Sequence, residues 1–346
     1  MFNIVLVGPG LIGKKHAQLL QNNKKCNLVA VVAPDHQCNH SFAKENGIPI
    51  YHDLNDCLNH VKADGVIISS PNKFHFEQAV TCIEHNVPTL VEKPITASVE
   101  EGEKLVEISK NKNVPILVGH HRAHSPILEK SRSIIQSGKL GRLVSVTGSA
   151  QFFKPVDYFK AGPWRTQEGG GPILINLIHE IGNLRSLCGE ISAVHAFASS
   201  AIRGFPVEDT VSINLRFSNG VLGNFLLSDT SACARSWEHT TAENPVYPVS
   251  LDEDCYIVTG TRGYLSIPTF KLRIYPDGVE SSWLSPMSED IVQFERKDPL
   301  ECQLNHFIDV ISGRSEPLVS AVDGLMNLKI TDAISMSAKT GQVVYL

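Results

Sequence analysis

The first third of the chain alternates short apolar runs with segments whose apolar residues recur at helical spacing. Short, continuous apolar runs are typical of strands that are buried on both faces. Strands that alternate with amphipathic helices predict a parallel sheet with helices on both sides. We expect strands at 4–7, 28–33, 66–69, 89–91 and 116–118, and helices at 12–22, 74–85 and 99–112.

The pattern changes after about residue 120. A helix is predicted at 125–137, and turn signals such as Ser218-Asn219-Gly220 then separate β-rich runs, which favours antiparallel pairing. These runs lie at 143–153, 191–199, 210–217, 221–227, 255–259 and 264–267, with further helices at 173–188, 300–311 and 325–337. The sequence therefore predicts two domains, residues 1–122 and residues 123–346, the second largely antiparallel.

Composition narrows the class of protein. A chain of 346 residues can bury two cores, and its net charge of −5 creates no basic field for nucleic acid. None of the eight cysteines forms a CxxC pair, which favours free thiols in a reducing compartment. No apolar run approaches the roughly 20 residues of a membrane helix, and the first residues enter a strand without a basic leader. We expect a soluble, cytoplasmic protein without a membrane or nucleic-acid partner.

Three glycines lie between the first predicted strand and the first predicted helix. Gly8, Gly10 and Gly13 have the spacing GxGxxG, which allows a tight turn, a close approach to a pyrophosphate and close packing of helix on strand. The second expected signal is an acidic residue after the next strand, where Ala33 stands and Asp35 follows. No arginine follows to attract a 2′-phosphate. The cofactor is therefore NAD or NADP, and Asp35 inclines the choice towards NAD.

Charged and polar residues follow two other apolar strands. Glu92 and Lys93 come directly after the strand at 89–91, and an X-Pro bond at Pro94 can be cis and direct the lysine. Burial or a nearby cation would lower the pKa of such a lysine, which can then stabilise an alkoxide or accept a proton. The alternative is a surface ion pair between Glu92 and Lys93. The strand at 66–69 is followed by residues that can line a cofactor: Ser69, Pro71, Asn72 and His75. The alternative is that these residues form only a turn and the start of a helix.

A glycine-rich approach precedes a histidine in the second domain. Residues 169–171 are all glycine, and the helix predicted after them carries one apolar face and places His179 on another side. Histidine is the usual acid or base at neutral pH. Just upstream, Trp164 and Arg165 are candidates for contact with a hydroxyl or carboxylate of the substrate, or with the cofactor; the alternative is a packed Trp and a surface Arg.

The glycine turn, "EKP", "GHHRAHSP" and "GGG…H", in this order, resemble the glucose–fructose oxidoreductase/inositol dehydrogenase family, also called Gfo/Idh/MocA. The resemblance implies an α/β protein with an N-terminal Rossmann domain, a doubly wound parallel sheet, and a C-terminal α+β domain with an open, mostly antiparallel sheet. It implies a homodimer or homotetramer formed through that sheet. It also implies that Lys93 and His179 are catalytic and face the nicotinamide from the two domains. The implied cofactor-binding set is Gly8, Gly10, Leu11, Ile12, Gly13, Ala33, Asp35, Ser69, Pro71, Asn72, His75, Glu92, Lys93, His121 and Arg122.

Two positions depart from the family pattern. The aspartate often found four residues before the histidine is Ile175, and the one three residues after it is Gly182. Asn176 remains three residues before His179, where its amide could orient the imidazole. Substrate contacts are expected from Lys93, Trp164, Arg165, Asn176 and His179. His120 and His124 have the spacing of helical zinc ligands, but no third ligand lies nearby, so no metal site is expected.

The expected activity is that of an NAD(P)-dependent dehydrogenase acting on a CH–OH group. It would transfer a hydride between the nicotinamide and a carbon of a polyol, sugar or related hydroxylated compound. His179 would take the hydroxyl proton while Lys93 stabilises the alkoxide, and these roles can be exchanged. Two alternatives stay open: NAD-assisted glycoside cleavage, and a non-catalytic NAD(P)-binding regulator of the same fold. Ile175 and Gly182 favour the regulator, whereas the retained lysine and histidine argue against it.

Overall fold

The computed structural model describes all residues, 1–346, as two compact units. The first consists of Met1–His124 with Pro299–Leu328, and the second of Ser125–Asp298 with Lys329–Leu346. The division predicted from the sequence placed 299–328 with the second domain, whereas this segment packs with the first unit. No helix is both long enough and apolar enough to span a membrane. None of the eight cysteines forms a disulfide bond.

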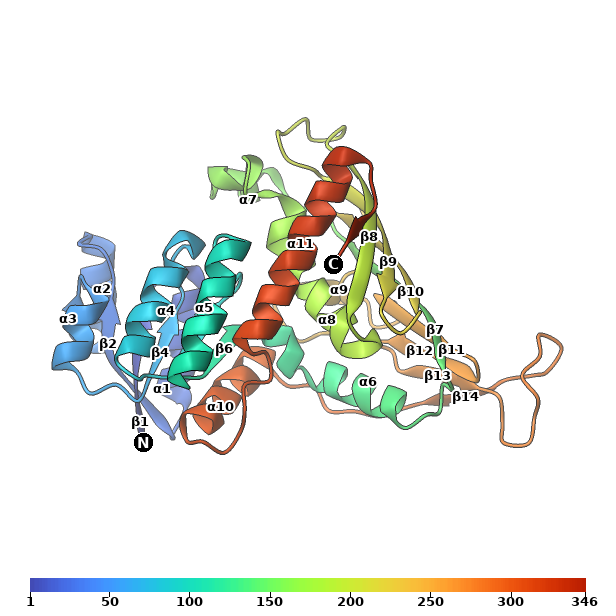
Figure 1. The fold of residues 1–346 in the computed structure, drawn as a ribbon, viewed down its shortest axis with the longest axis horizontal. Coiled ribbons are helices and arrows are strands. Elements are labelled where there is room, and N and C mark those ends of the chain that lie inside the picture. Colours follow the sequence, from blue (N-terminus) through green and yellow to red (C-terminus); the bar gives the residue numbers. More distant parts are fainter. The chain divides into compact units, whose positions relative to one another are not determined.

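The first unit is built on a six-stranded sheet in the order β3-β2-β1-β4-β5-β6, in which every pair is parallel (Figure 1). This is the Rossmann-like arrangement expected from the alternating pattern. The strands are β1 (Phe2–Val7), β2 (Cys26–Val32), β3 (Ile50–Tyr51), β4 (Gly65–Ile68), β5 (Thr89–Glu92) and β6 (Ile116–Gly119). The helices of this unit are α1 (Leu11–Asn22), α2 (Gln37–Asn46), α3 (Leu54–His60), α4 (His75–Glu84), α5 (Val99–Lys112) and α10 (Pro299–Ile311), with 3₁₀ turns η1 (Asn72–Phe74) and η2 (His121–His124).

Side chains of β1 alternate between two hydrophobic cores, one on each face of the sheet. Ile4 and Leu6 pack in a core with Leu20 of α1 and Phe307 of α10. Val5 and Val7 pack in the other core with residues of α3, α4 and α5. Because α10 supplies buried side chains to the first core, the segment that begins at Pro299 completes one of the two helical layers of this sheet.

The second unit contains a nine-stranded open sheet in the order β14-β13-β12-β11-β7-β10-β9-β8-β15. Every pairing is antiparallel except that of β7 with β10, so the sheet is mixed and mostly antiparallel, as predicted. The strands are β7 (Leu143–Gln151), β8 (Ile191–Ser199), β9 (Thr210–Phe217), β10 (Leu222–Ser228), β11 (Tyr256–Gly260), β12 (Gly263–Ile267), β13 (Lys271–Ile274), β14 (Ser288–Ile291) and β15 (Val344–Tyr345).

Helices of the second unit pack their apolar residues against this sheet. The segment predicted as one helix at 173–188 begins as a π-helix, η4 (Ile173–Leu177), and continues as α8 (Ile178–Cys188). The apolar face predicted for it is buried, from Ile173 to Cys188. The remaining elements are α6 (Pro126–Gln136), α7 (Val156–Lys160), η3 (Pro163–Thr166), α9 (Trp237–Thr240) and α11 (Ala321–Thr340), the last of which continues from the first unit into the second.

Candidate functional site

The glycine turn joins β1 to α1, and its three glycines are required for different reasons. Gly8 has φ +81, and a Cβ there would lie 2.7 Å from backbone atoms of Ser70. A Cβ on Gly13 would lie 2.1 Å from the carbonyl oxygen of Gly8. At Gly10 an added Cβ would meet nothing within 4 Å. Packing within the protein therefore explains Gly8 and Gly13, whereas Gly10 borders open space.

The amino terminus of α1 also lacks a side-chain cap. Its first backbone N–H groups are therefore not satisfied by a capping oxygen, and such groups bind anions, helped by the helix dipole. Leu11 in this first turn is 90% exposed. The uncapped helix end beside the open space at Gly10 fits the pyrophosphate of a dinucleotide.

A matched pair of variants separates the two kinds of glycine. Gly10→Ala is expected to fold normally, because its φ of −74° suits alanine and the added methyl meets no atom. Gly13→Ala is expected to lose about 1–3 kcal/mol of stability from overpacking against Gly8. Thermal unfolding measures this difference, and calorimetric titration with NAD and NADP measures affinity. We expect Gly10→Ala to bind dinucleotide more weakly despite its normal stability; wild-type affinity in this variant would contradict the assignment of Gly10 to the pyrophosphate.

Residues after β4 hold the glycine turn and the turn after β5 together. The Ser69 hydroxyl lies 2.9 Å from the carbonyl oxygen of Val7 and 2.8 Å from that of Gly8. The buried His75 ring contacts the carbonyls of Ser70 and Pro94, at 2.9 and 2.8 Å. Burial lowers the pKa of His75, although the two carbonyls and Glu92 oppose this shift. Both side chains therefore act on backbone, while Pro71 is exposed and Asn72 half-buried.

The EKP segment continues β5 at the same edge of the sheet. Glu92 is buried, and its Oε1 lies 2.8 Å from Nε2 of the buried His16 on α1. This excludes the alternative of a surface ion pair for Glu92. The Lys93-Pro94 bond is cis. The Glu92 carboxylate therefore links the end of β5, directly before Lys93, to the helix that begins at the glycine turn.

Lys93 is close to other cationic or basic groups of the first unit. Burial lowers its pKa to about 8, with a further lowering from Arg122 and an opposing effect of Glu92. The pKa of His121 is held well below its usual value by burial and then by Arg122 and Lys93. Arg122 itself is buried. The predicted residues at the end of β5 and in η2 thus form one cluster, in which Lys93 can exchange a proton near neutral pH.

In the second unit, η4 and α8 carry the candidate substrate residues. His179 is buried in the first turn of α8, and Glu180 beside it accepts a hydrogen bond from the Tyr256 hydroxyl. The Asn176 side-chain oxygen accepts a hydrogen bond of 2.7 Å from Lys154. The amide oxygen that could have oriented His179 is therefore held by a lysine that the sequence did not single out.

Lys154 itself is part of a polar network around the segment that precedes Gly169–Gly171. Its ammonium lies 3.8 Å from a carboxylate oxygen of Asp229 and 4.9 Å from the ring centre of Tyr158. The guanidinium of Arg165 lies over the same ring at 4.0 Å, and Trp164 is 56% exposed. A Cβ on Gly170 would lie 2.6 Å from the carbonyl oxygen of Trp164, so this glycine permits close packing on the Trp-Arg turn. Arg165 is thereby oriented by an aromatic ring rather than left on the open surface.

The predicted residues form two groups, one in each unit. The group of the first unit lies at the carboxyl ends of β1, β2, β4, β5 and β6, because parallel strands all end at the same edge. The group of the second unit lies on η3, η4 and α8. Sequence reasoning did not find His16 or Lys154, since neither belongs to a motif that the pattern distinguishes from a helix or strand residue.

Comparison with known proteins gives matches along most of the chain. A family model described as the oxidoreductase family with an NAD-binding Rossmann fold matches residues 2–120, and the GFO/IDH/MocA C-terminal domain matches residues 128–266. The rhizopine catabolism protein MocA of Rhizobium meliloti is 28% identical over 230 residues, covering 64% of this chain and 69% of that protein. The scyllo-inositol 2-dehydrogenase (NAD(+)) of Bacillus subtilis is 25% identical over 351 residues, covering 99% of this chain and 95% of that protein.

A solved structure extends the similarity to the whole fold. An oxidoreductase from Agrobacterium radiobacter, in complex with NAD+, L-tartaric acid and magnesium, has a TM-score of 0.82 at 17% identity. The superposition covers 99% of this chain and 98% of that one. The arrangement of strands and helices is therefore shared over both units.

Proposed function

Because this chain belongs to the Gfo/Idh/MocA oxidoreductase family, we propose that it is an NAD(P)-dependent dehydrogenase acting on a CH–OH group. The substrate class is a polyol, a sugar or a related small hydroxylated compound. The observation that carries the proposal is Lys93, whose pKa is lowered to about 8 at the same sheet edge as the glycine turn. A lysine whose pKa is lowered by burial at a ligand-binding edge of a sheet is typical of a functional site.

The proposed roles follow from the chemistry of each side chain. When bound, the nicotinamide supplies the acceptor or donor of the hydride. His179 accepts the hydroxyl proton during oxidation, because an imidazole is the usual base at neutral pH. Lys93, as an ammonium, stabilises the negative charge that develops on the substrate oxygen. Glu92 contacts His16 and thereby fixes the end of β5, directly before Lys93. Arg122 and His121 complete the cluster around Lys93.

For the dinucleotide we propose NAD. Asp35 is exposed, and a hydrogen bond from His40 lowers the pKa of its carboxyl group, which therefore stays ionised near neutral pH. A carboxylate near the adenosine ribose repels a 2′-phosphate, whereas Ala33 supplies no charge at the position that most often carries one. The preference rests on one exposed charge, whose interactions are strongly screened by water. We therefore expect measurable activity with NADP as well.

A substrate panel tests the proposed function. Polyols, sugars and hydroxy acids are incubated with the protein and either NAD or NADP, and nicotinamide absorbance is followed. The expected result is reduction of the dinucleotide by at least one polyol or sugar, faster with NAD. Release of free sugar from glycosides without net reduction would instead indicate NAD-assisted glycoside cleavage. Tight binding of dinucleotide with no turnover of any compound would indicate a non-catalytic regulator.

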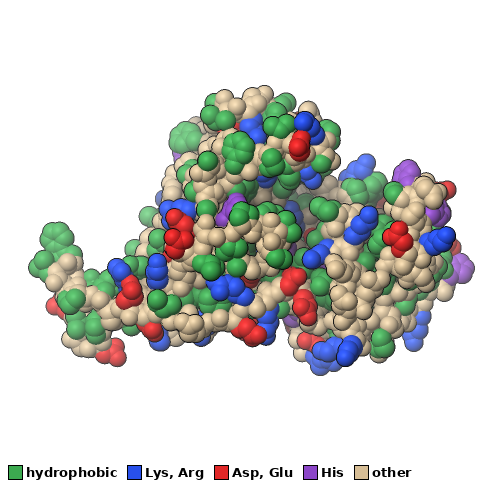
Figure 2. All heavy atoms as spheres, turned by 180° about the vertical axis from the view of Figure 1, so that it is seen from behind, with side chains coloured by type: hydrophobic (Ala, Val, Ile, Leu, Met, Phe, Trp, Pro, Cys, Tyr) green, Lys and Arg blue, Asp and Glu red, His purple; other side chains and the backbone are tan.

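We also propose that two or four copies associate through the open sheet of the second unit. The segment 275–287 between β13 and β14 projects from the edge of this sheet, and hydrophobic side chains gather on it (Figures 1 and 2). Trp283 is 95% exposed and Leu284 is 85% exposed. Large apolar side chains at such exposure are typical of contacts between proteins.

Removing these two side chains is expected to weaken the association. Burial of one large apolar side chain contributes about 1.5–3 kcal/mol, so Trp283→Ser/Leu284→Ser is expected to raise the dissociation constant about tenfold or more. Sedimentation velocity over a range of protein concentrations measures the shift. Val246→Ser is the matched control, because Val246 is 81% exposed elsewhere in the same unit. An unchanged distribution of species in the double variant would exclude this segment from the interface.

A further inference from the structure

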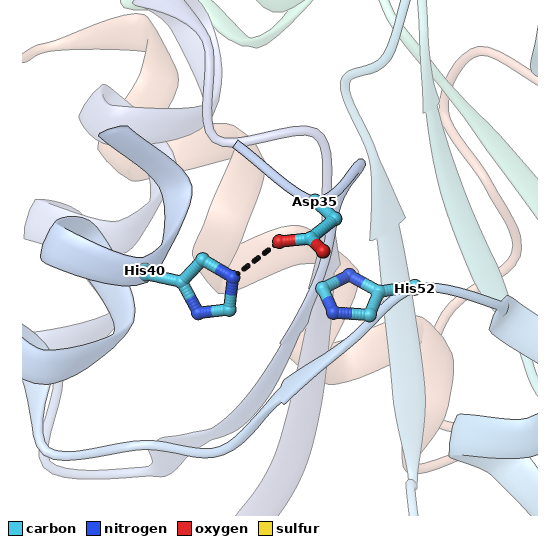
Figure 3. Close-up of side chains that lie close together, drawn as sticks. All are labelled: Asp35, His40 and His52. Atoms are coloured by element: carbon cyan, nitrogen blue, oxygen red, sulfur yellow. Dashed lines mark hydrogen bonds and ion pairs between the residues drawn. The ribbon is translucent and has the colours of Figure 1, made fainter. Parts of the chain in front are cut away.

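Three side chains that can bind metals meet beyond the carboxyl ends of β2 and β3. The two strands are parallel neighbours, with Val32 opposite Tyr51, and the Ala33 amide donates to the Tyr51 carbonyl at 3.0 Å. The residues that follow the strands, Asp35 and His52, therefore leave the sheet side by side. His40 reaches the same place from the first turns of α2 (Figure 3).

The distances within this trio suit a single ion. The Oδ1 atom of Asp35 lies 2.7 Å from Nε2 of His40. The ring centres of His40 and His52 lie 5.6 Å apart at an interplanar angle of 69°. One ligand atom from each of the three residues lies within 4.8 Å of the others. The side chains of His40 and Asp35 are 42% and 77% exposed, so an ion can enter from solution.

A backbone contact fixes the proton on one of the imidazoles. Nδ1 of His52 lies 2.9 Å from the carbonyl oxygen of Ala33. A carbonyl oxygen only accepts, so Nδ1 carries the hydrogen and the neutral ring has its lone pair on Nε2. Histidines that bind metals commonly donate their other ring N–H to a carbonyl in this way. This second observation distinguishes the trio from an ordinary surface pair of His and Asp.

We propose that Asp35, His40 and His52 form a binding site for a divalent transition metal, of which Zn²⁺ fits best. Two imidazole nitrogens and one carboxylate oxygen are ligands that zinc takes readily, with a fourth tetrahedral position open to water. Zinc takes the place of the hydrogen between Nε2 of His40 and Asp35, so a neutral His40 binds the ion as the tautomer with its hydrogen on Nδ1.

The place of this site in the fold gives it a consequence for the cofactor. Asp35 follows Ala33 by two residues, at the strand end proposed to contact the adenosine ribose. This consequence therefore rests on the proposed function. A metal ion that holds Asp35 and His52 occupies that sheet edge, so zinc lowers the affinity for the dinucleotide, whereas formation of the metal site itself does not depend on any enzymatic activity.

The first test is calorimetric titration of the full chain with Zn²⁺ in a buffer that does not chelate it. We expect one ion per chain, and His40→Gln and His52→Gln are each expected to weaken binding by about tenfold or more. His60→Gln is the matched control, because His60 forms an exposed pair with Asp56 at 3.2 Å and is not part of the trio. Cys38→Ser removes an exposed thiol on α2 that could bind zinc instead. Wild-type affinity in both trio variants, or loss of binding in Cys38→Ser alone, would overturn the proposal.

The second test repeats the titration with NAD in the presence and absence of zinc. Zinc is expected to raise the apparent dissociation constant for NAD in the wild-type chain and not in His52→Gln. If zinc binds to the trio but leaves NAD affinity unchanged, the coupling is overturned while the metal site stands. If NAD fails to bind even without zinc, the proposed function fails, and the zinc titration still decides the metal site on its own.

Discussion

Replacing Lys93 with alanine is expected to lower turnover of the best substrate in the panel by about 10²–10⁴-fold. The variant loses the only charge that we propose to stabilise the substrate oxygen as its proton leaves. Dinucleotide affinity is expected to change far less, because the glycine turn and the first turn of α1 remain intact. Steady-state kinetics with parallel calorimetric titrations separate the two quantities, and added alkylamines are expected to restore part of the lost rate.

The pH dependence of the oxidation rate distinguishes the two possible roles of Lys93. The pKa of Lys93 is lowered to about 8, so the ammonium is present below that pH and is lost above it. If the ammonium stabilises the alkoxide, the rate of oxidation falls as pH rises through about 8. Lys93→Arg keeps its charge throughout and is expected to lack this falling limb, even at a reduced rate. A limb that rises through the same pH would instead assign the proton-accepting role to Lys93.

The matched control for Lys93 is another lysine at the same sheet edge. Lys73 lies in η1, where its ammonium is 4.8 Å from the ring centre of Phe74, and it is exposed. Lys73→Ala removes the same charge from the chain without touching the cluster around Arg122. We expect near wild-type turnover from it. Equal losses in Lys73→Ala and Lys93→Ala would mean that only net positive charge matters at this edge.

Replacing His179 with alanine is expected to lower turnover by a similar factor, about 10²–10⁴-fold. His179 is buried in the first turn of α8, directly after the π-helix, and we propose that its imidazole accepts the hydroxyl proton. His179→Asn introduces an amide that can form hydrogen bonds but cannot exchange a proton, and this variant is expected to be as slow as His179→Ala. Added imidazole is expected to restore part of the activity of His179→Ala and none of that of Lys93→Ala.

Controls for His179 come from the same unit. His195 lies in β8, with its ring 4.9 Å from that of Phe197, and it is half-buried. His195→Ala is expected to keep its turnover, and thermal unfolding of all three variants excludes simple loss of fold. A His179→Asn variant with wild-type turnover would remove the imidazole from the proposed chemistry.

The elements that sequence reasoning predicted best are those with a strong apolar signal. The strands β1 and β5 and the helix α5 occur where continuous or periodic apolar residues placed them, within one or two residues at each end. The elements it missed have little such signal. In α2 only Phe42 and Ala43 are buried, β3 has two residues, and every residue of β14 is exposed. Short or exposed elements owe their conformation to neighbours rather than to their own pattern.

In the candidate site, too, some features could be predicted from the sequence and others could not. The location of Lys93 followed from its strand alone, because every parallel strand ends at one edge of the sheet. Its partners did not, since Glu92 meets His16 across 76 positions of the chain and Lys154 meets Asn176 across 22. The π-helical start of the segment at 173–188 also has no signature that separates it from an α-helix. These contacts depend on tertiary packing, which residue spacing does not encode.

A double-mutant cycle on Lys93 and His179 tests most directly whether the two residues act on one substrate hydroxyl. The rates of Lys93→Ala, His179→Ala and the double variant are compared with the wild type as kcat/KM for the same substrate. We predict that the double variant is about as slow as the slower single variant, because groups that serve one transition state lose their effects together. A double variant whose loss equals the product of the two single losses would contradict the account.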